Sequence, residues 1–322
     1  MRLNHKHANY LRIVISFSIV IFGWLTITGS GDSSDSSKNP ASYQKVSSSS
    51  FSPIRATNAA GENETLYWKY RINDGKEVTA EQDNLTMRFS FSTIDMTIDP
   101  KSLKRKADFK GDISGEVEGL SLNGDVEASV DETLSSLETS TFVDTQNLKI
   151  DMVLTVMGEK MEMNIDMSTD FEEPVEWFLD RNDLDTLPIG YVYDEQGDIT
   201  GMATGTFELE IPGLDTIKES VNDPVVSVES WEIIGKLDTY TVNGTEYNNI
   251  VKVKRKTKIP ESGLSGVSFT DADIIYWVAK GIGMIKGEGQ FSILGQPLSV
   301  ELVETNLSVS VEEFENETGD TE

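Results

Sequence analysis

An alternation of apolar and polar residues with a period of two runs through most of the central part of the chain. In one such segment the apolar residues of a single parity are Leu103, Ala107, Phe109, Ile113 and Val117. The positions of the other parity carry mostly lysine, aspartate and glutamate. Because successive side chains of a strand point to opposite faces, the pattern predicts a half-buried strand with one solvated face.

The preceding segment changes parity at its middle. Its apolar residues are Leu85, Met87, Phe89 and Phe91 at odd positions, then Ile94, Met96 and Ile98 at even positions. Without a distortion, this shift would turn half of the apolar side chains to water. We therefore predict a β-bulge or a sharp bend within this strand.

Hairpins are predicted where turn-forming residues separate alternating segments. The clearest is the methionine-rich segment 148–168, with its turn near Gly158-Glu159, and Asn123-Gly124 and Asn243-Gly244 are further turn signals. Near the C-terminus we expect strands at Ile274–Val278, Met284–Ile285, Phe291–Leu294 and Leu298–Glu304, with Gly295-Gln296-Pro297 turning between the last two.

Helical spacing is scarce. Val130, Leu134 and Leu137 fit one short helix, and Leu214, Ile217 and Val221 fit another after Pro212. The expected fold is mainly β, a large curved antiparallel sheet of about ten or more strands with one to three short helices.

The N-terminus has the order of a secretory signal. Basic residues without an acid precede an apolar run over 13–28, which ends in Gly29-Ser30-Gly31. We expect a signal peptide or an uncleaved signal anchor at 1–30 and a disordered tether rich in Ser and Asp at 31–62. A single β-rich domain at 63–310 and a disordered acidic tail at 311–322 follow. We expect an extracytoplasmic location, either secreted or tethered to the outer face of the membrane.

Rare residues exclude several kinds of site. The chain has no cysteine, and its two histidines, His5 and His7, lie within the expected signal. A mature chain then lacks thiol nucleophiles, Ser-His-Asp triads, Cys/His zinc sites, haem with His or Cys ligands, and iron–sulfur clusters. The net charge of −28 also disfavours nucleic acid, whose phosphates it repels. We expect a non-enzymatic protein without a cofactor.

Methionines are the leading ligand-binding candidates. Seven of the ten fall between Met87 and Met167. A period of two places most of them on the buried face, where their flexible, polarisable side chains suit a deformable apolar cavity. The candidates are Met87, Met96, Met152, Met161, Met163 and Met167. The alternatives are a loosely patterned sheet core and, with less support, a thioether site for Cu(I).

Acidic residues supply two weaker candidates. Asp180, Asn182, Asp183 and Asp185 lie in one loop segment and could hold calcium through hard oxygen ligands, although no known loop motif is matched. The alternative is a solvated acidic loop. Glu172, Glu173 and Glu176 precede Trp177 and Phe178, as a carboxylate-based glycan hydrolase would require.

Basic residues gather in two clusters. Their members are Lys101, Lys104, Arg105, Lys106 and Lys110 in the first, and Lys252, Lys254, Arg255, Lys256 and Lys258 in the second. Contact with anionic headgroups of a membrane surface or with cell-wall polymers is one interpretation. The other is an edge strand that its lysines protect from aggregation.

One C-terminal segment carries a resemblance to a known group of proteins. The strand that contains Tyr276, Trp277 and Ala279 ends in Gly281 and Gly283, and a return strand begins with Met284, Ile285 and Lys286. This pattern resembles secreted bacterial lipoproteins of unknown function, and the hairpin at 148–168 is similar to another group of them. Both groups look like the LolA/LolB-like architecture. The stretch 25–37 resembles a lipoprotein signal with Ser30 at the place of the lipidated cysteine, and serine cannot take a thioether lipid.

The resemblance implies a half-open β-barrel around short helices, with an apolar concavity that carries or senses lipid. It implies no catalytic residues, and we add Trp277 to the candidate ligand-binding residues. The leading hypothesis is a non-enzymatic extracytoplasmic protein that binds an apolar or lipid-like ligand. Its rivals are a structural or interaction module of the cell envelope without a ligand, and a carboxylate-based glycan hydrolase.

Overall fold

A computed structural model describes most of the chain between residues 44 and 309. The described residues are 44–46, 50–59, 64–82, 85–117, 120–136, 140–156, 158–194, 199–210, 216–258, 272–290 and 297–309. Within them the chain is mainly β, with the helix α2 (Pro53–Ala59) and the 3-10 turns η1 (Asn73–Gly75) and η2 (Phe178–Asp180). The predicted class, a mainly β fold with a large curved antiparallel sheet, is confirmed.

The described strands form one large antiparallel sheet and one separate pair. In pairing order the sheet consists of β10 (Ile199–Glu210), β8 (Glu159–Trp177), β7 (Thr141–Val156), β6 (Leu120–Ser136), β5 (Lys104–Val117), β4 (Leu85–Asp99), β2 (Leu66–Ile72), β15 (Pro297–Thr305), β14 (Gly283–Gln290), β13 (Ala272–Ala279), β12 (Thr245–Lys258), β11 (Ile217–Val242) and β9 (Val192–Asp194). β3 (Val78–Gln82) pairs with the N-terminal part of β4. β1 (Gln44–Val46) and β16 (Leu307–Val309) form a parallel pair.

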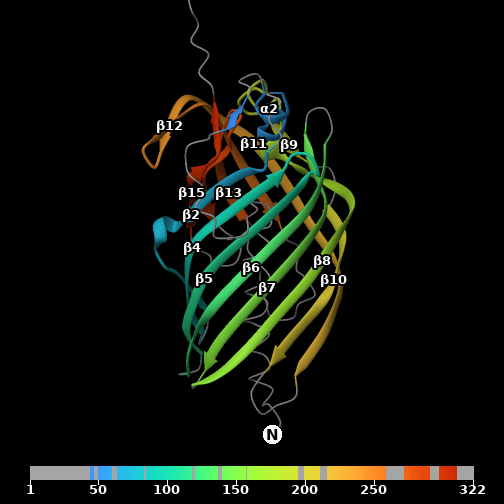
Figure 1. The fold of residues 1–322 in the computed structure, drawn as a ribbon, viewed down its shortest axis with the longest axis vertical. Helices are drawn as coiled ribbons and strands as arrows, with labels where there is room; N and C mark the ends of the chain where they lie inside the picture. The colour runs from blue at the N-terminus through green and yellow to red at the C-terminus, as the bar shows by residue number, and fades with distance from the viewer. Residues whose placement is uncertain are drawn as a thin grey trace, which may run out of the picture.

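The sheet winds round without closing. Ile217–Ser227 of β11 pairs with β10, and Val228–Val242 pairs with β12, so that no residue of β11 pairs with both strands. Among the described residues, β3 and β9 each pair with a single strand. Figure 1 shows the long strands β4 to β8 and β10 as a curved wall, with β11 to β15 behind it.

The two faces of this wall differ in polarity because apolar and polar residues alternate along each strand. On β8, Met163 and Ile165 are buried inside, whereas Glu162 and Asn164 are exposed outside. The inner face forms the hydrophobic core, and its burial stabilises the fold by about 25 cal/mol per Å² of apolar surface.

Four of the strands behind the wall are much shorter than the wall strands, whereas β11 has 26 residues and β12 has 14. β2, β13, β14 and β15 have 7, 8, 8 and 9 residues, whereas β6, β7 and β8 have 17, 16 and 19. At about 3.3 Å per residue, the short strands span about half of the wall's length. β2 pairs with β4 only over 93–98, at the end of the wall beside α2, which we call the α2 end. The opposite end is called the far end.

Two local features bend the long strands. The register between β4 and β5 shifts between Phe91 and Ile94, which confirms the predicted β-bulge. Within β6, a Cβ atom on Gly124 would overlap the carbonyl oxygen of Val153 on β7, so that only glycine permits this close approach of two strands. The predicted turn at Asn123-Gly124 is therefore wrong. The apolar alternation continues across it without a change of phase, as in one continuous strand.

The two predicted helices are also wrong. Val130 and Leu134 lie in β6, and Ile217 and Val221 lie in β11, whereas Leu137 and Leu214 lie outside the described residues. Each pair is four residues apart. An even spacing fits one face of a strand as well as one face of a helix, and here the sheet determines the outcome.

Other predicted turns and strands are confirmed. Gly158 lies between β7 and β8, and Asn243-Gly244 joins β11 to β12 with φ values of 49° and 82°, as a tight hairpin requires. The strands expected at 274–278, 284–285 and 298–304 lie within β13, β14 and β15, and 291–296 lies outside the described residues. Gly281, in the turn between β13 and β14, has a φ of 71°, and Gly283, the first residue of β14, has a φ of 91°.

The α2 region lies inside the range expected to be a tether. Phe51 and Ser52 have no exposed surface and Ile54 is 2% exposed, because the α2 end of the sheet covers them. The expected signal at 1–30 and the acidic tail at 311–322 lie outside the described residues. No helix in the described ranges has the length and apolar character needed to cross a membrane.

Candidate functional site

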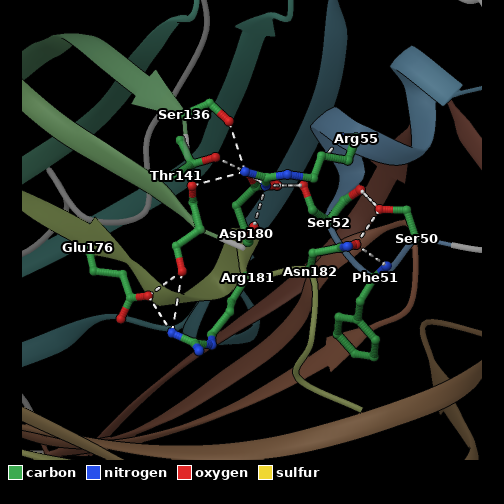
Figure 2. Close-up of polar contacts among 11 residues, drawn as sticks. Ser50, Phe51, Ser52, Arg55, Ser136, Thr141, Glu176, Asp180, Arg181 and Asn182 are labelled. Atoms are coloured by element: carbon green, nitrogen blue, oxygen red, sulfur yellow. Dashed lines mark hydrogen bonds and ion pairs between the residues drawn. The ribbon is translucent and has the colours of Figure 1, made fainter. Parts of the chain in front are cut away.

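A buried polar cluster fixes α2 to η2 and to the start of β7, as Figure 2 shows. Asp180 is fully buried, and its carboxylate accepts hydrogen bonds from Ser52 Oγ at 2.6 Å and from Thr141 Oγ1. Arg55 Nη1 lies 3.6 Å from the same carboxylate. Ser52 Oγ also accepts the backbone N–H of Arg55 at 3.3 Å, which caps the first turn of α2. We call these four residues the α2 latch.

The environment of Asp180 disfavours its charged form. Burial raises the pKa of Asp180, because the ionised carboxylate loses its hydration. The hydrogen bonds from Ser52 and Thr141, the guanidinium of Arg55 and the backbone N–H of Ile54 act in the opposite direction, and burial outweighs them. Because Ser52 and Asp180 have no exposed surface, no substrate reaches this hydroxyl–carboxylate pair.

The loop after η2 adds a second polar cluster. Arg181 binds both carboxylate oxygens of Asp183, at 2.6 and 3.1 Å, and donates to Glu176 Oε1 at 2.7 Å. Ser140 Oγ donates to the same Glu176 oxygen. Asn182 Oδ1 accepts from Ser50 Oγ at 2.6 Å, so that this loop also holds the chain just before α2.

A buried ion pair lies on the inner face at the α2 end. Arg105 of β5 and Glu132 of β6 have side chains that are 1% exposed, and Arg105 Nε donates to Glu132 Oε2. Gln146 Nε2 donates to the other oxygen of Glu132 at 2.9 Å. The guanidinium carbon of Arg105 lies 4.2 Å from the ring centroid of Trp177, a cation–π contact.

Aromatic rings complete the α2 end of the interior. Phe178 stacks on Trp231 with 6.0 Å between ring centroids and meets Tyr276 edge-on at 5.5 Å. The ring of Tyr193 also stacks on Trp231, with 5.3 Å between the ring centroids. Arg255 of β12, which is 2% exposed, lies 5.8 Å from the Phe178 ring. These contacts bury the α2 end of the interior from bulk water.

A small cavity lies between α2 and this aromatic end. Its walls include Pro53 of α2, Trp68, Tyr70, Met96, Trp177 and Met284. Its volume is about 10 Å³, room for about one water molecule. The wall is mainly apolar, and the indole N–H of Trp68 and the hydroxyl of Tyr70 donate to the backbone carbonyls of Ile282 and Met284.

The predicted methionines lie on the inner face but not in one place. Met152 on β7 and Met163 on β8 pair directly across the strands, are 2% and 1% exposed, and lie towards the far end. Met161 and Met167 are partly buried on the same face. Met96, 4% exposed, lines the cavity beneath α2. The side chain of Met87 lies outside the described part of the structure.

Trp277 lies on the opposite face of the sheet from the methionines. Its neighbour Tyr276 contacts Phe178 inside, so that Trp277 points outward. There its ring lies between Lys252 Nζ and Lys286 Nζ, at 4.8 and 5.1 Å from the centroid, and stacks on Tyr240. The structure does not bring this predicted ligand-binding residue together with the others.

The four calcium candidates have separate partners. Asp180 belongs to the α2 latch, Asn182 binds Ser50, Asp183 binds Arg181, and Asp185 pairs with Lys280 at 2.8 Å. Nowhere in the described residues do three or more acidic, histidine or cysteine side chains converge as a metal site.

The carboxylates considered for glycan hydrolysis lie in different surroundings. Glu172 is exposed and accepts from Thr200 Oγ1 at 2.7 Å, and Glu173 is exposed as well. Glu176 instead has a largely buried side chain, paired with Arg181. These contacts do not place the three carboxylates around a common aromatic cleft.

The two basic clusters do not lie on edge strands. β5 and β12 each pair with one strand on either side. The prediction of an edge strand protected by lysines is therefore wrong. Arg105 and Arg255 point inward. On the outer face, Lys110 pairs with Glu127 at 2.8 Å and Lys254 with Asp273 at 2.9 Å, so neighbouring acids neutralise part of the positive charge.

Sequence reasoning missed the α2 latch and the buried ion pair. The latch joins segments that are 128 residues apart in sequence, and no local sequence pattern indicates such a contact. The ion pair did leave a signal, since Arg105 shares the parity of Ala107 and Phe109, and Glu132 shares that of Val130 and Leu134. Charged residues at apolar positions of two neighbouring strands indicate a buried pair.

Comparison with known proteins adds no identification at this point. No protein-family model, no curated protein and no solved structure matches this chain.

Proposed function

We propose that this protein binds an apolar or lipid-like ligand, without catalysis, against the methionine-lined inner face of its curved sheet. The single observation behind the proposal is the mismatch in length between that face and four of the strands opposite it. The apolar face follows strands of 16 to 19 residues, whereas β2, β13, β14 and β15 have 7 to 9. An apolar surface of this length can accept an elongated apolar molecule.

The composition of the far end supports an adaptable contact. Met152 and Met163 form a cross-strand pair there, and Met161 remains partly exposed on the inner face. Methionine has three rotatable bonds and a polarisable sulfur, so that it packs against ligands of differing shape. The open sheet also leaves room for the wall to adjust. Both features fit a carrier or sensor better than an enzyme that must orient a reacting bond.

The proposal places the protein outside the cytoplasm, secreted or tethered to the outer face of the membrane, as the N-terminal signal predicts. In that setting the partners are an apolar ligand and the membrane surface or cell-wall polymers. The LolA/LolB-like resemblance belongs to the same proposal, because it implies an apolar concavity in a half-open sheet.

A structural or interaction module of the cell envelope is the second candidate. The observation in its favour is the tight packing of the α2 end, where a cavity of about 10 Å³ holds about one water molecule. Under this alternative the inner face is an ordinary core. Its methionines then fill space and bind nothing.

Binding of the neutral apolar dye Nile red to protein stripped of lipid separates the two candidates. The test variant combines Met161→Leu with Met163→Leu, a nearly volume-conserving change that costs under about 1.5 kcal/mol per site. We expect the folded wild type to bind the dye and the variant to bind it with a changed affinity. The control is Met202→Leu on β10, where the side chain is 42% exposed, and it should behave as the wild type. Wild type that binds no dye contradicts the ligand-binding proposal.

A further inference from the structure

Trp177 contains a buried hydrogen-bond donor that the described residues leave unsatisfied. The residue ends β8, is 6% exposed, and its Nε1 has no hydrogen-bond partner among the described residues. Trp68, in the same cavity wall, instead donates its indole N–H to Ile282 O at 2.7 Å. Buried tryptophan N–H groups normally find an acceptor, because leaving one unpaired destabilises the fold. The described residues therefore do not supply the acceptor for Trp177.

The cavity beneath α2 is where such an acceptor can lie. Trp177 lines it together with Pro53, Trp68, Met96 and Leu179. The polar hydrogens of Trp68 and Tyr70 are already donated to carbonyl oxygens, so that the indole N–H of Trp177 is the donor left over in this wall. The present volume of about 10 Å³ accommodates a single water. A larger ligand requires one wall to move.

The wall formed by α2 is the one that moves at least cost. α2 has seven residues, too few for a helix that is stable by itself. Its contacts are partly apolar, through the buried Ile54 and Ala56, and partly polar, through Ser52 to Asp180 at 2.6 Å. Water can replace polar contacts of this kind when the segment opens locally. Leu179 of η2 forms part of another wall. The remaining wall residues belong to β2, β4, β8 and β14, which backbone ladders to neighbouring strands hold in place.

We propose that the cavity beneath α2 binds the polar end of an apolar molecule that carries one acceptor oxygen, such as the carbonyl of an acyl ester. The indole N–H of Trp177 donates to that oxygen, and the apolar body lies along the inner face beyond Met96. A water molecule occupies the acceptor position in the ligand-free protein, and displacement of α2 admits the ligand. This inference rests on the proposed function and specifies its ligand class as oxygen-bearing acyl compounds rather than pure hydrocarbons.

Two probes of matched chain length test the assignment, methyl decanoate with an acceptor oxygen and decane without one. The readout is the indole N–H signals of the tryptophans in a proton–nitrogen correlation spectrum. Trp177→Phe keeps the aromatic ring and identifies the signal by its loss. We expect the ester to move the Trp177 signal downfield and decane to leave it in place, with the Trp68 signal little changed by either.

No movement with the ester, or equal movement with both probes, overturns the inference. If the lipid-stripped wild type binds Nile red but the ester does not move its Trp177 indole signal, this site is wrong and the proposed function stands. If the wild type neither binds the dye nor shows a moved Trp177 signal, both proposals are wrong. These outcomes keep the two proposals separate.

The displacement of α2 has its own test, which does not require the Trp177 variant to fold. Ser52→Ala removes a hydrogen bond of the latch, and we expect it to lower the ester concentration at half-saturation by about fivefold. Ser135→Ala is the matched control, because Ser135 donates to Asp144 at 2.7 Å instead of holding α2. An unchanged concentration in Ser52→Ala contradicts entry beneath α2.

Discussion

Replacing Glu132 by glutamine measures how strongly the buried ion pair holds the α2 end together. The Glu132 carboxylate accepts from Arg105 Nε with one oxygen and from Gln146 Nε2 at 2.9 Å with the other. Glutamine has nearly the same shape but no charge, and one of its two terminal atoms is a donor. The variant therefore loses the charge that compensates Arg105 and turns an N–H group towards another donor.

The expected cost follows from the burial of both side chains, each 1% exposed. Removing one partner of a buried pair costs about 3–5 kcal/mol, because the remaining charge stays in a low-dielectric interior. Glutamine retains one acceptor oxygen, so we expect a loss at the lower end, about 3 kcal/mol. Replacing both partners by apolar residues, Arg105→Met with Glu132→Leu, should cost much less, because no uncompensated charge remains.

Urea denaturation followed by tryptophan fluorescence measures both variants. Arg105 contacts the Trp177 ring, so the emission of the folded state also reports any local rearrangement. We expect the single variant to lower the midpoint clearly and the double variant to recover most of the loss. A cost below about 1 kcal/mol for Glu132→Gln would refute the reasoning. So would a double variant that recovers none of the stability lost in Glu132→Gln.

Two further predictions concern Asp180 and the glycines of the wall. Because the folded pKa of Asp180 is raised by burial, its contribution opposes folding as pH rises from about 4 towards that pKa. In the wild type, the free energy of unfolding should therefore fall over this pH range, and Asp180→Asn should abolish that fall. Urea titrations at several pH values that give the same profile for both proteins would contradict this. Gly124→Ala should lower the free energy of unfolding by about 1–3 kcal/mol, because the new Cβ atom overlaps Val153 O. Gly235→Ala is the control, and it should cost less than half as much in the same titrations, because the nearest atom to its Cβ is 3.6 Å away. Equal costs at the two glycines would count against the close approach of β6 and β7.

The period of two was sufficient to predict strands, faces and the bulge, because each depends on residues close in sequence. The hairpin of β7 and β8 and the parity change between Phe91 and Ile94 are confirmed for this reason. The same local view misread Val130 and Leu134 as a helix and Asn123-Gly124 as a turn. In both cases the neighbouring strands of the sheet, which lie far away in sequence, determine the conformation.

The candidate site was predictable only in part. Met152 and Met163 lie on the inner face as their parity predicts. Trp277 was placed with them on resemblance, although its parity relative to Tyr276 already put it on the other face. The α2 latch depends on the meeting of Ser52 with Asp180, and nothing in either local sequence indicates which segment the other will contact.

The distribution of buried charge separates the two ends of the interior. The charged side chains that are fully buried in the described part of the chain are Arg105, Glu132, Asp180 and Arg255. All four lie at the α2 end. The Arg105–Glu132 pair contacts Trp177, Asp180 belongs to the α2 latch, and Arg255 lies over Phe178. A buried polar group tolerates few arrangements, because it must keep its hydrogen-bond partner. Apolar contacts are non-directional and remain favourable in many arrangements. The α2 end is thereby specified in detail, whereas the described core of the far end, with Met152, Met163 and Leu209, is purely apolar. Under the proposed function, a ligand recognised by one oxygen at the α2 end can therefore differ in length and branching at the far end.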